Sequence, residues 1–112
     1  MQRPIFTEVL VVTTTVGNMD DALRIARLAV KKQFAACVQL ESLAASVYRW
    51  EGKVCEEPEV RLTFKALSVE KENLLELVRE HHPYELPQLT WTLMECSEDY
   101  GSWLVANSSI DF

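Results

Sequence analysis

A glycine-centred reversal between two long strand-like segments constrains the fold of this chain more than any other feature of its sequence. Residues 34–50 are rich in apolar and β-prone types, and a second such segment follows the reversal at 51–53. A short glycine turn of this kind joins antiparallel strands, so we predict a long β-hairpin. We expect the first arm to bend at 42–45. Pro58 cannot donate a ladder hydrogen bond and marks an edge or a bulge near the tip.

The predicted hairpin is too long for a small domain to bury. An arm of about 15 residues spans roughly 50 Å at strand rise, whereas a helix of about 14 residues spans only about 21 Å. The tip, which carries Tyr48, Trp50 and Val54, therefore extends beyond any helix that packs on the sheet. Exposed aromatic side chains beside an open strand edge favour pairing with another chain. We expect an obligate oligomer with Tyr48 and Trp50 at its interface.

Local patterns predict the remaining elements. They are a strand at 5–13, a helix from about 20 to 33, a helix capped by Ser68 and ending near Arg79, a strand at 89–94, and a short helix capped by Ser97. The positions predicted to face the core are Ala22, Ile25, Ala26, Ala29 and Val30 in the first helix, Leu74, Leu75, Leu77 and Val78 in the second, and Val60, Leu62 and Phe64 in the hairpin. This element order predicts the α+β class, as a ferredoxin-like βαββαβ sandwich with a long β-hairpin and an extra C-terminal helix. We expect one domain over residues 1–112.

Charge and cysteine content exclude several classes of partner. The chain has 11 basic and 17 acidic residues and a net charge of −6, which disfavours nucleic acid and anionic membranes. Three dispersed cysteines, Cys37, Cys55 and Cys96, do not form a disulfide framework and indicate a reducing compartment. The apolar run at 9–12 is too short for a signal peptide or a membrane span. We expect a cytoplasmic protein.

Both histidines of the chain, His81 and His82, are adjacent in a loop that also holds Pro83 and Pro87. The prolines end the preceding helix and order the loop. Histidine has an ordinary pKa close to neutrality, so it binds metals or moves protons at little cost. A structural role suits the same residues, because a histidine at a helix C-terminus favours the negative end of the dipole. The residues alone leave both interpretations open.

Several motifs together resemble the CutA family of divalent-cation-tolerance proteins over nearly the whole chain. They are Ala22-x-x-Ile25-Ala26, Phe34-Ala35-Ala36-Cys37-Val38, Tyr48-x-Trp50-x-Gly52-Lys53, the strand at 59–65, His81-His82-Pro83-Tyr84, Pro87 and Tyr100-x-x-Trp103. The resemblance implies a ferredoxin-like fold, a homotrimer in which long hairpins wrap neighbouring subunits, and an association with copper and other divalent metals. The family is also similar in subunit fold and assembly to PII-type signalling proteins.

The resemblance implies a metal site at His81 and His82. In the copper-binding members a cysteine at the end of the first strand completes the ligands, and its position here is Thr14. Because a hydroxyl does not replace a thiolate for a soft ion, we expect Cu(2+) or another divalent metal rather than copper(I). Adjacent side chains on extended backbone diverge, so one histidine binds while the other orients the loop, or two subunits share the ion. Glu80 and Glu85 are candidate oxygen ligands.

The resemblance also implies a ligand-binding cleft between subunits near Glu59, Lys65 and Tyr84, although ordinary solvation of a sheet face explains the same residues. Three classes of function follow. The first is divalent metal binding in cation tolerance, with copper foremost. The second is a trimeric PII-like regulatory module that binds a small anion or metabolite through Arg61, Lys65 and Tyr84. The third is an enzyme, which we do not expect because no nucleophile triad, paired-acid motif or phosphate loop stands out.

Two residue types need no ligand role. We expect Cys37 to pack as a small apolar side chain, because a free cysteine beside alanines at the start of a strand commonly does so. Trp50, Trp91 and Trp103 are expected to anchor the core or an interface, since a large aromatic ring stabilises whichever surface buries it.

Overall fold

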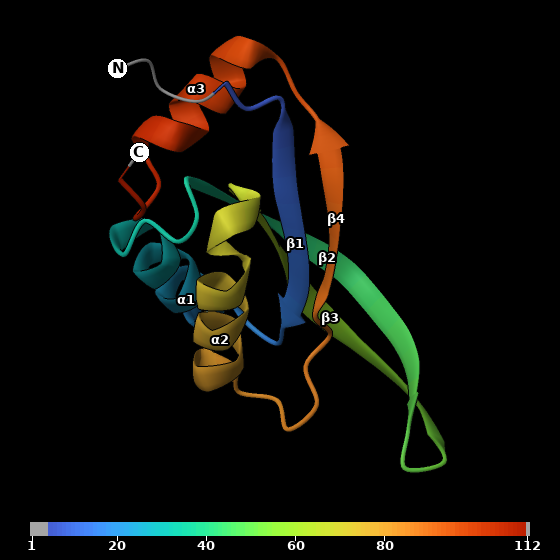
Figure 1. Ribbon diagram of the computed structural model, residues 1–112. Helices are drawn as coiled ribbons and strands as arrows, with labels where there is room; N and C mark the ends of the chain where they lie inside the picture. The colour runs from blue at the N-terminus through green and yellow to red at the C-terminus, as the bar shows by residue number, and fades with distance from the viewer. Residues whose placement is uncertain (1–4, 112) are drawn as a thin grey trace.

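The computed structural model describes residues 5–111, which form a four-stranded antiparallel sheet with helices on both faces (Figure 1). The elements in chain order are β1 (Glu8–Val16), α1 (Met19–Lys31), β2 (Cys37–Trp50), β3 (Lys53–Ala66), the 3-10 turn η1 (Ser68–Glu70), α2 (Lys71–His81), β4 (Thr90–Glu95) and α3 (Glu98–Ala106). The strand order is β2-β3-β1-β4. This confirms the predicted α+β ferredoxin-like class with an added C-terminal helix. The single domain expected over 1–112 stays a prediction, and residues 1–4 and 112 lie outside the described range.

Alternation along the two central strands sorts their side chains onto two faces. Leu10 and Val12 of β1 lie on the same face as Leu62 and Phe64 of β3, as the antiparallel register requires. Helices α1 and α2 cover this face, and Leu62 and Phe64 are fully buried. Val60, Leu62 and Phe64 therefore face the core as predicted. The sheet is held by packing on this face.

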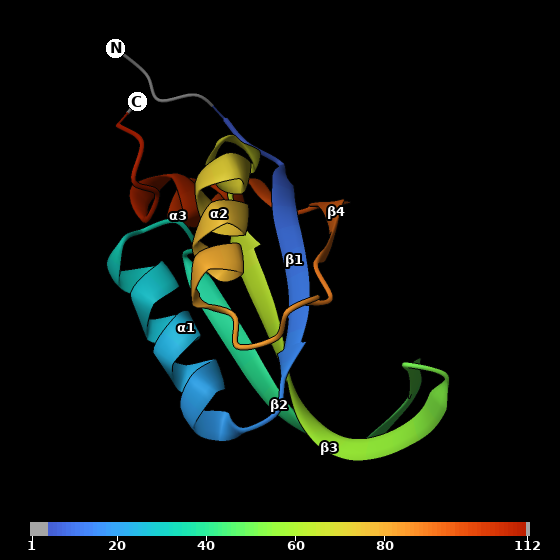
Figure 2. The same cartoon turned by 90° about the horizontal axis from the view of Figure 1, so that it is seen from below.

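The hairpin extends past the helices, as its length predicted. The described residues are about 57 Å long but only 23 Å and 20 Å across, and the distal part of β2 and β3 curls away from the helices (Figure 2). The register shifts between Leu43 and Ser46, where two residues of β2 lie opposite Pro58 alone. This bulge confirms both the predicted bend at 42–45 and the predicted role of Pro58, and it adds curvature to the hairpin.

Several predicted boundaries differ from the structure. Strand β1 runs from Glu8 to Val16 rather than over 5–13, and β4 is displaced by one residue to Thr90–Glu95. Helix α1 ends at Lys31, two residues earlier than expected, because Gln33 takes a left-handed conformation with φ 62°. The prediction that Val30 is buried is wrong, since it lies on the outer side of α1 with 42% of its surface exposed.

The prediction that Ser68 caps the second helix is also wrong. Ser68 begins the 3-10 turn η1 and makes no capping hydrogen bond, and α2 itself starts at Lys71 and ends at His81. The carboxylate of Glu70 is fully buried at this junction. It accepts hydrogen bonds from Ser108 Oγ, from the N–H and Oγ of Ser109, and from Asn73 Nδ2. These contacts join the C-terminal segment to the start of α2.

Helix α3 covers one end of the opposite face of the sheet. Ser97 caps it as predicted, accepting a hydrogen bond from the N–H of Tyr100. Gly101 lies so close to the carbonyl of Phe6 that an added Cβ would overlap it, so this position requires glycine. Trp91 and Trp103 are 44% and 42% exposed, and neither is a core residue of this chain. Their role at an interface stays a prediction.

Candidate functional site

His82 follows α2 directly, and its imidazole is buried against the end of β1. Its Nε2 lies 2.9 Å from the carbonyl oxygen of Thr15 and 3.0 Å from Thr14 Oγ1. The backbone N–H of Tyr84 donates to Nδ1 over 3.1 Å. Because a carbonyl only accepts and an amide N–H only donates, these contacts select the neutral tautomer with its proton on Nε2. Both ring nitrogens of His82 are thus used within the chain.

Thr14 is fully buried beside this imidazole. Its hydroxyl donates to the carbonyl oxygen of Gln88 over 2.5 Å, so β1 holds the 83–88 loop at its far end as well as through His82. Thr14 therefore adjoins the histidine loop. Here the oxygen is part of a hydrogen-bond network between β1 and the loop.

Burial lowers the pKa of His82 below its ordinary value of 6.5. The hydrogen bond to the Thr15 carbonyl and the charges of Asp21 and Glu59 act in the opposite direction, but burial outweighs them. The imidazole is therefore neutral at pH 7, in agreement with its hydrogen-bond pattern. A neutral ring that donates once and accepts once is suited to ordering a loop.

His81 is the last residue of α2 and points away from His82. It is half-buried in a hollow of about 200 Å³ on the helical side, together with Lys32, Phe34 and Glu80. Its backbone carbonyl accepts a hydrogen bond from Arg24 over 3.1 Å, whereas within residues 5–111 its ring nitrogens have no hydrogen-bond partner. The two imidazoles diverge, as expected for adjacent residues, and only that of His81 is open to an added ligand.

The metal-ligating side chains are dispersed. Among the residues that the structure describes, no three or more histidine, cysteine, aspartate and glutamate side chains come together in a way that would hold a metal ion. Glu80 lies beside His81, but Glu85 lines a separate cavity. The three cysteines, Cys37, Cys55 and Cys96, are free and partly buried. The described residues of one chain therefore offer the imidazole of His81 and the nearby carboxylate of Glu80, which do not form a complete coordination shell.

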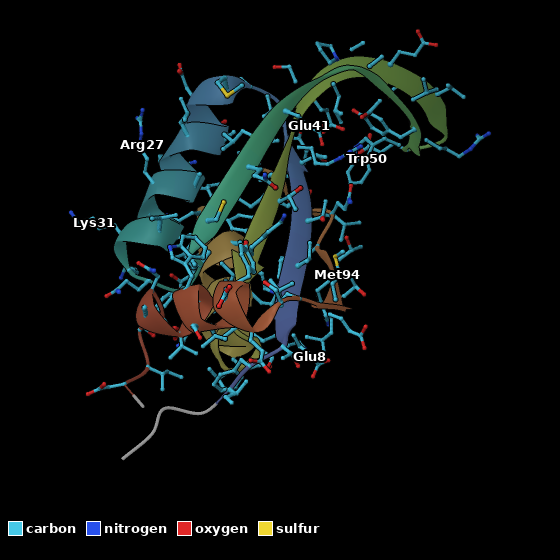
Figure 3. The ribbon with its side chains drawn as sticks, turned by 90° about the horizontal axis from the view of Figure 1, so that it is seen from above. Glu8, Arg27, Lys31, Glu41, Trp50 and Met94 are labelled. Atoms are coloured by element: carbon cyan, nitrogen blue, oxygen red, sulfur yellow. The ribbon has the colours of Figure 1, made fainter. Side chains whose placement is uncertain are left out.

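A larger cavity lies between the curled distal hairpin and the 83–88 loop. We call it the hairpin cavity, and its volume is about 480 Å³. Its wall combines the aromatic rings of Tyr48, Trp50 and Tyr84 with the carboxylates of Glu57, Glu59 and Glu85. Thr15, Ser46, Leu86 and Gln88 complete the lining. Trp50 lies on the inner side of the curled hairpin (Figure 3).

Tyr84 connects the loop to the hairpin across this cavity. Its hydroxyl donates to Glu59 Oε2 over 2.9 Å, and its ring lies against His82 with centroids 4.9 Å apart. Burial and the interaction with Glu59 raise the pKa of Tyr84, so the hydroxyl stays protonated and continues to donate. The structure thus brings together Glu59 and Tyr84, two of the three residues expected at a cleft.

The third expected residue, Lys65, does not line the hairpin cavity. It lies further along β3, opposite Cys37. Arg61, expected to help bind a small anion or metabolite, pairs with Glu41 over 3.0 Å and lies opposite the lining residue Thr15. Every described residue that lines the cavity is uncharged or acidic. The wall that one chain contributes is therefore acidic.

Sequence reasoning missed Glu57 and assigned Glu85 only as a candidate metal ligand. The register places Tyr48 opposite Cys55 and Ser46 opposite Glu57, so these side chains share one face of the hairpin. The alternation of side chains along the strand around Pro58 was enough to indicate which residues share that face. It carried none for the curvature that makes the face concave, which comes from the bulge and the twist.

Comparisons with known proteins agree with this architecture. The family described as CutA1 divalent ion tolerance protein matches residues 10–107. A divalent-cation tolerance protein CutA from Yersinia pestis (strain Pestoides F) is 36% identical over 103 residues, covering 91% of this chain and 87% of that protein. The structure of the divalent cation tolerance protein Cut A1 from Thermus thermophilus superposes with a TM-score of 0.83 at 34% identity, covering 89% and 98% of the two chains. CutA1 from Pyrococcus horikoshii gives a TM-score of 0.85 at 30% identity, covering 88% and 97%.

Proposed function

The chain belongs to the CutA1 divalent ion tolerance protein family, and we propose that it acts in divalent cation tolerance by binding metal ions rather than by catalysis. One observation supports this more than any other. The imidazole of His81 has no hydrogen-bond partner among the described residues, whereas both ring nitrogens of His82 are used. An imidazole without a hydrogen-bond partner is a side chain that late transition metals bind well.

In this proposal the two histidines have different roles. His81 is the metal ligand, with Glu80 as a neighbouring oxygen donor, and His82 positions the loop. Copper(II) suits imidazole and carboxylate ligands, whereas copper(I) prefers thiolate, which Thr14 does not supply. Since one described chain lacks three convergent ligands, the site is weak or is completed by a neighbouring subunit.

We also propose that the protein is a homotrimer with the distal hairpin at its interfaces. Tyr48 and Trp50 remain 39% and 43% exposed in the single chain. Every residue of the edge strand β4 is exposed as well, including Leu93 and Met94. Open strand edges that carry apolar side chains are the surfaces that a second chain covers. Sedimentation equilibrium tests this, and a stable monomer at micromolar concentration would exclude it.

Calorimetric titration with copper(II) tests the metal site. We expect wild type and His82→Gln to bind, and we expect His81→Ala to lose most of the affinity. Glu72→Gln, an exposed change in the first turn of the same helix, serves as the charge control. Unchanged binding by His81→Ala would exclude His81 as the ligand.

Thr14→Cys tests the choice between oxidation states. The new thiol would lie where the Thr14 hydroxyl is now, next to His82 Nε2. We expect it to increase affinity for copper(I) while leaving copper(II) affinity within about threefold, because thiolate is a soft ligand. Thr14→Ser keeps the hydroxyl and is the matched control. If both variants bind copper(I) alike, Thr14 does not adjoin a metal site.

A second candidate function rests on the hairpin cavity. We propose that the cavity binds a small molecule and that the protein acts as a PII-like regulatory module. The hydrogen bond from Tyr84 to Glu59 and a volume of about 480 Å³ support this, since ligand sites commonly measure about 300–1,000 Å³. A thermal-shift screen of metals against metabolites separates the two candidates, because any ligand that prefers the native state raises its Tm.

Within residues 5–111, none of the helices is long and apolar enough to cross a membrane. We propose that the protein is cytoplasmic, in keeping with its free cysteines. Cell fractionation with compartment markers tests this, and recovery in an oxidising compartment would contradict it.

A further inference from the structure

We propose that the chain regulates its own metal site. Residues 107–111, which we call the strap, hold the ammonium group of Lys32 in the hollow beside His81, where its positive charge opposes a divalent cation. The proposal rests on the metal-binding function proposed above for His81 and adds the regulation of that site.

The hollow lies between α2 and the turn that follows α1, two helices that run side by side (Figures 1 and 2). One face of α2 lines it, with the side chains of Asn73, Glu76, Leu77, Glu80 and His81. Lys32 and Phe34 of the turn complete the lining. The residues that we assign to the subunit interfaces, Tyr48, Trp50 and those of β4, lie outside it.

Lys32 brings a positive charge into this hollow. Its Nζ lies 6.0 Å from the centroid of the Phe34 ring, a cation–π contact with a ring that also lines the hollow. Within residues 5–111 no carboxylate lies at ion-pair distance from Lys32. A hollow of about 200 Å³ is small compared with a Debye length of about 10 Å, so the ammonium repels a divalent ion bound at His81.

The strap holds the turn that carries Lys32. Gln33, between Lys32 and Phe34, has φ 62°, a left-handed conformation that residues other than glycine rarely adopt. Its carbonyl oxygen accepts a hydrogen bond from the N–H of Ser109 over 2.9 Å. The same N–H lies 2.6 Å from Glu70 Oε2. One strap donor therefore joins the turn after α1 to the residue that precedes α2, and Figure 1 shows the chain after α3 running beside that turn.

The strap also acts on the α2 side of the hollow. The buried carboxylate of Glu70 accepts a hydrogen bond from Ser109 Oγ over 2.8 Å and one from Asn73 Nδ2 over 3.2 Å. Asn73 lines the hollow, so the strap contacts both of its sides through one intermediate residue each. Release of the strap frees the turn at Gln33 and lets the Lys32 ammonium move away from His81.

Calorimetric titration of the intact oligomer with copper(II) tests the role of Lys32. We expect Lys32→Gln to bind about three- to tenfold more tightly than wild type, with a gain that shrinks as salt is raised. Lys31→Gln removes the same charge from the adjacent residue, which is exposed, lies outside the lining and points away from the sheet (Figure 3), and should change affinity less than about twofold. The gain should disappear when Lys32→Gln is combined with His81→Ala. Equal affinity of Lys32→Gln and wild type would overturn the proposal.

A double substitution in the strap, Ser108→Ala with Ser109→Ala, removes both hydroxyl donors to Glu70. We expect it to raise copper(II) affinity about two- to threefold when Lys32 is present and to have no further effect in Lys32→Gln. Ser109→Ala alone should change affinity in the same direction, and Ser102→Ala, exposed on α3, is the control. Weaker binding in both backgrounds would mean that the strap only supports the fold, and unchanged binding would mean that it does not act on the site. Either result would overturn the proposal.

Hydrogen exchange of the metal-free protein gives a measurement that is independent of copper. The amide of Ser109 has two acceptors in the structure, so it should be protected in wild type and exchange faster in the strap variants. Unchanged exchange would show that the hydroxyls do not hold the strap and would also count against the proposal.

The same titrations separate this inference from the function on which it rests. If wild type binds copper(II) and His81→Ala does not, but Lys32→Gln binds like wild type, the metal site stands and its regulation by Lys32 is excluded. If Lys32→Gln binds copper(II) and wild type does not, both proposals are supported. If no variant binds copper(II), both fail. Sedimentation of each variant confirms that its assembly is intact.

Discussion

The two ends of the β2–β3 hairpin are made of the same two strands but have opposite environments. At the proximal end Leu62 and Phe64 are fully buried beneath α1 and α2. At the distal end Val47 is 64% exposed and Trp50 is 43% exposed. Apolar residues occur at both ends, so the difference arises from what covers them. At the proximal end helices of the same chain cover the apolar side chains. At the distal end no part of the described chain covers them.

The polar groups show the same contrast. In the helix-covered part of the molecule His82, Thr14 and Glu70 are buried and every one of them is hydrogen-bonded. In the distal hairpin Glu57 lines the hairpin cavity, and its only side-chain partner among the described residues, Tyr48, is itself partly exposed. A buried polar group must find its partners within the fold, while a group at a cavity is free to meet a ligand or another subunit. Function is therefore expected at the distal hairpin and at His81, where side-chain groups remain available.

Truncating one apolar side chain at each end tests this contrast with the largest expected effect. Phe64→Ala should lower the free energy of unfolding by about 3–5 kcal/mol, because it removes a fully buried ring. Val47→Ala should change it by less than about 0.5 kcal/mol, since Val47 is mostly exposed. Urea denaturation at one protein concentration measures both. Similar losses would show that the outer face of the hairpin is also buried in the assembly.

Trp50→Ala tests whether another chain covers the distal end. We expect the oligomer to dissociate, with a loss of about 2 kcal/mol or more per interface, because large aromatic residues dominate such contacts. Trp50→Phe keeps a ring and should remain assembled. Sedimentation velocity gives the oligomeric state, and circular dichroism checks the fold. An unchanged oligomer in Trp50→Ala would remove Trp50 from the interface.

Acid stability tests the self-contained part of the molecule. Burial alone would raise the pKa of Glu70, but hydrogen bonds from Ser108, Ser109 and Asn73 outweigh it and lower the pKa below its ordinary value of 4.5. A carboxyl whose pKa is lowered by folding stabilises the protein above its unfolded pKa and loses that contribution as the pH falls through the folded pKa.

Wild type should therefore lose stability as the pH falls from about 5 toward 3, and Glu70→Gln should lose about 1–2 kcal/mol at pH 7 and show a flatter acid limb. Glu72→Gln, exposed in the first turn of α2, is the control and should follow wild type. Chemical denaturation across the pH range measures this. If the free energy of unfolding falls in parallel for Glu70→Gln and wild type as the pH is lowered, the ionised Glu70 carboxylate does not supply the acid-sensitive stability.

The smallest effect is expected at the turn. Gly52 has φ 78°, and an added Cβ would meet no atom within 4 Å, so Gly52→Ala should cost only conformational strain of about 1 kcal/mol. Gly101→Ala is the opposite case, because its Cβ would overlap the carbonyl of Phe6. We expect Gly101→Ala to lower Tm clearly more than Gly52→Ala. The reverse order would mean that the tip turn is itself held by contacts of the assembly.

Much of the architecture was predictable because it depends on local patterns. Alternation at Val60, Leu62 and Phe64 identified the core face of β3, and the residues at 51–53 identified the turn. Ser97 and Pro58 acted as expected, since capping and a missing N–H depend on the residue itself. The Ser68 cap failed because Leu67 and Glu70 are buried and form a 3-10 turn there.

The sequence by itself determined the order of elements, the face of each strand that meets the helices, the excess length of the hairpin and the proximity of His81 to His82 along the chain. Each of these follows from side-chain period, turn chemistry or strand rise. Only the tertiary structure decided which histidine is available, because the partners of His82 lie 67 and 68 positions away on β1. It likewise decided that Tyr84 meets Glu59, 25 positions away, and that curvature gathers carboxylates and rings into one cavity. Such long-range contacts depend on how the sheet twists and packs, and no local pattern encodes them.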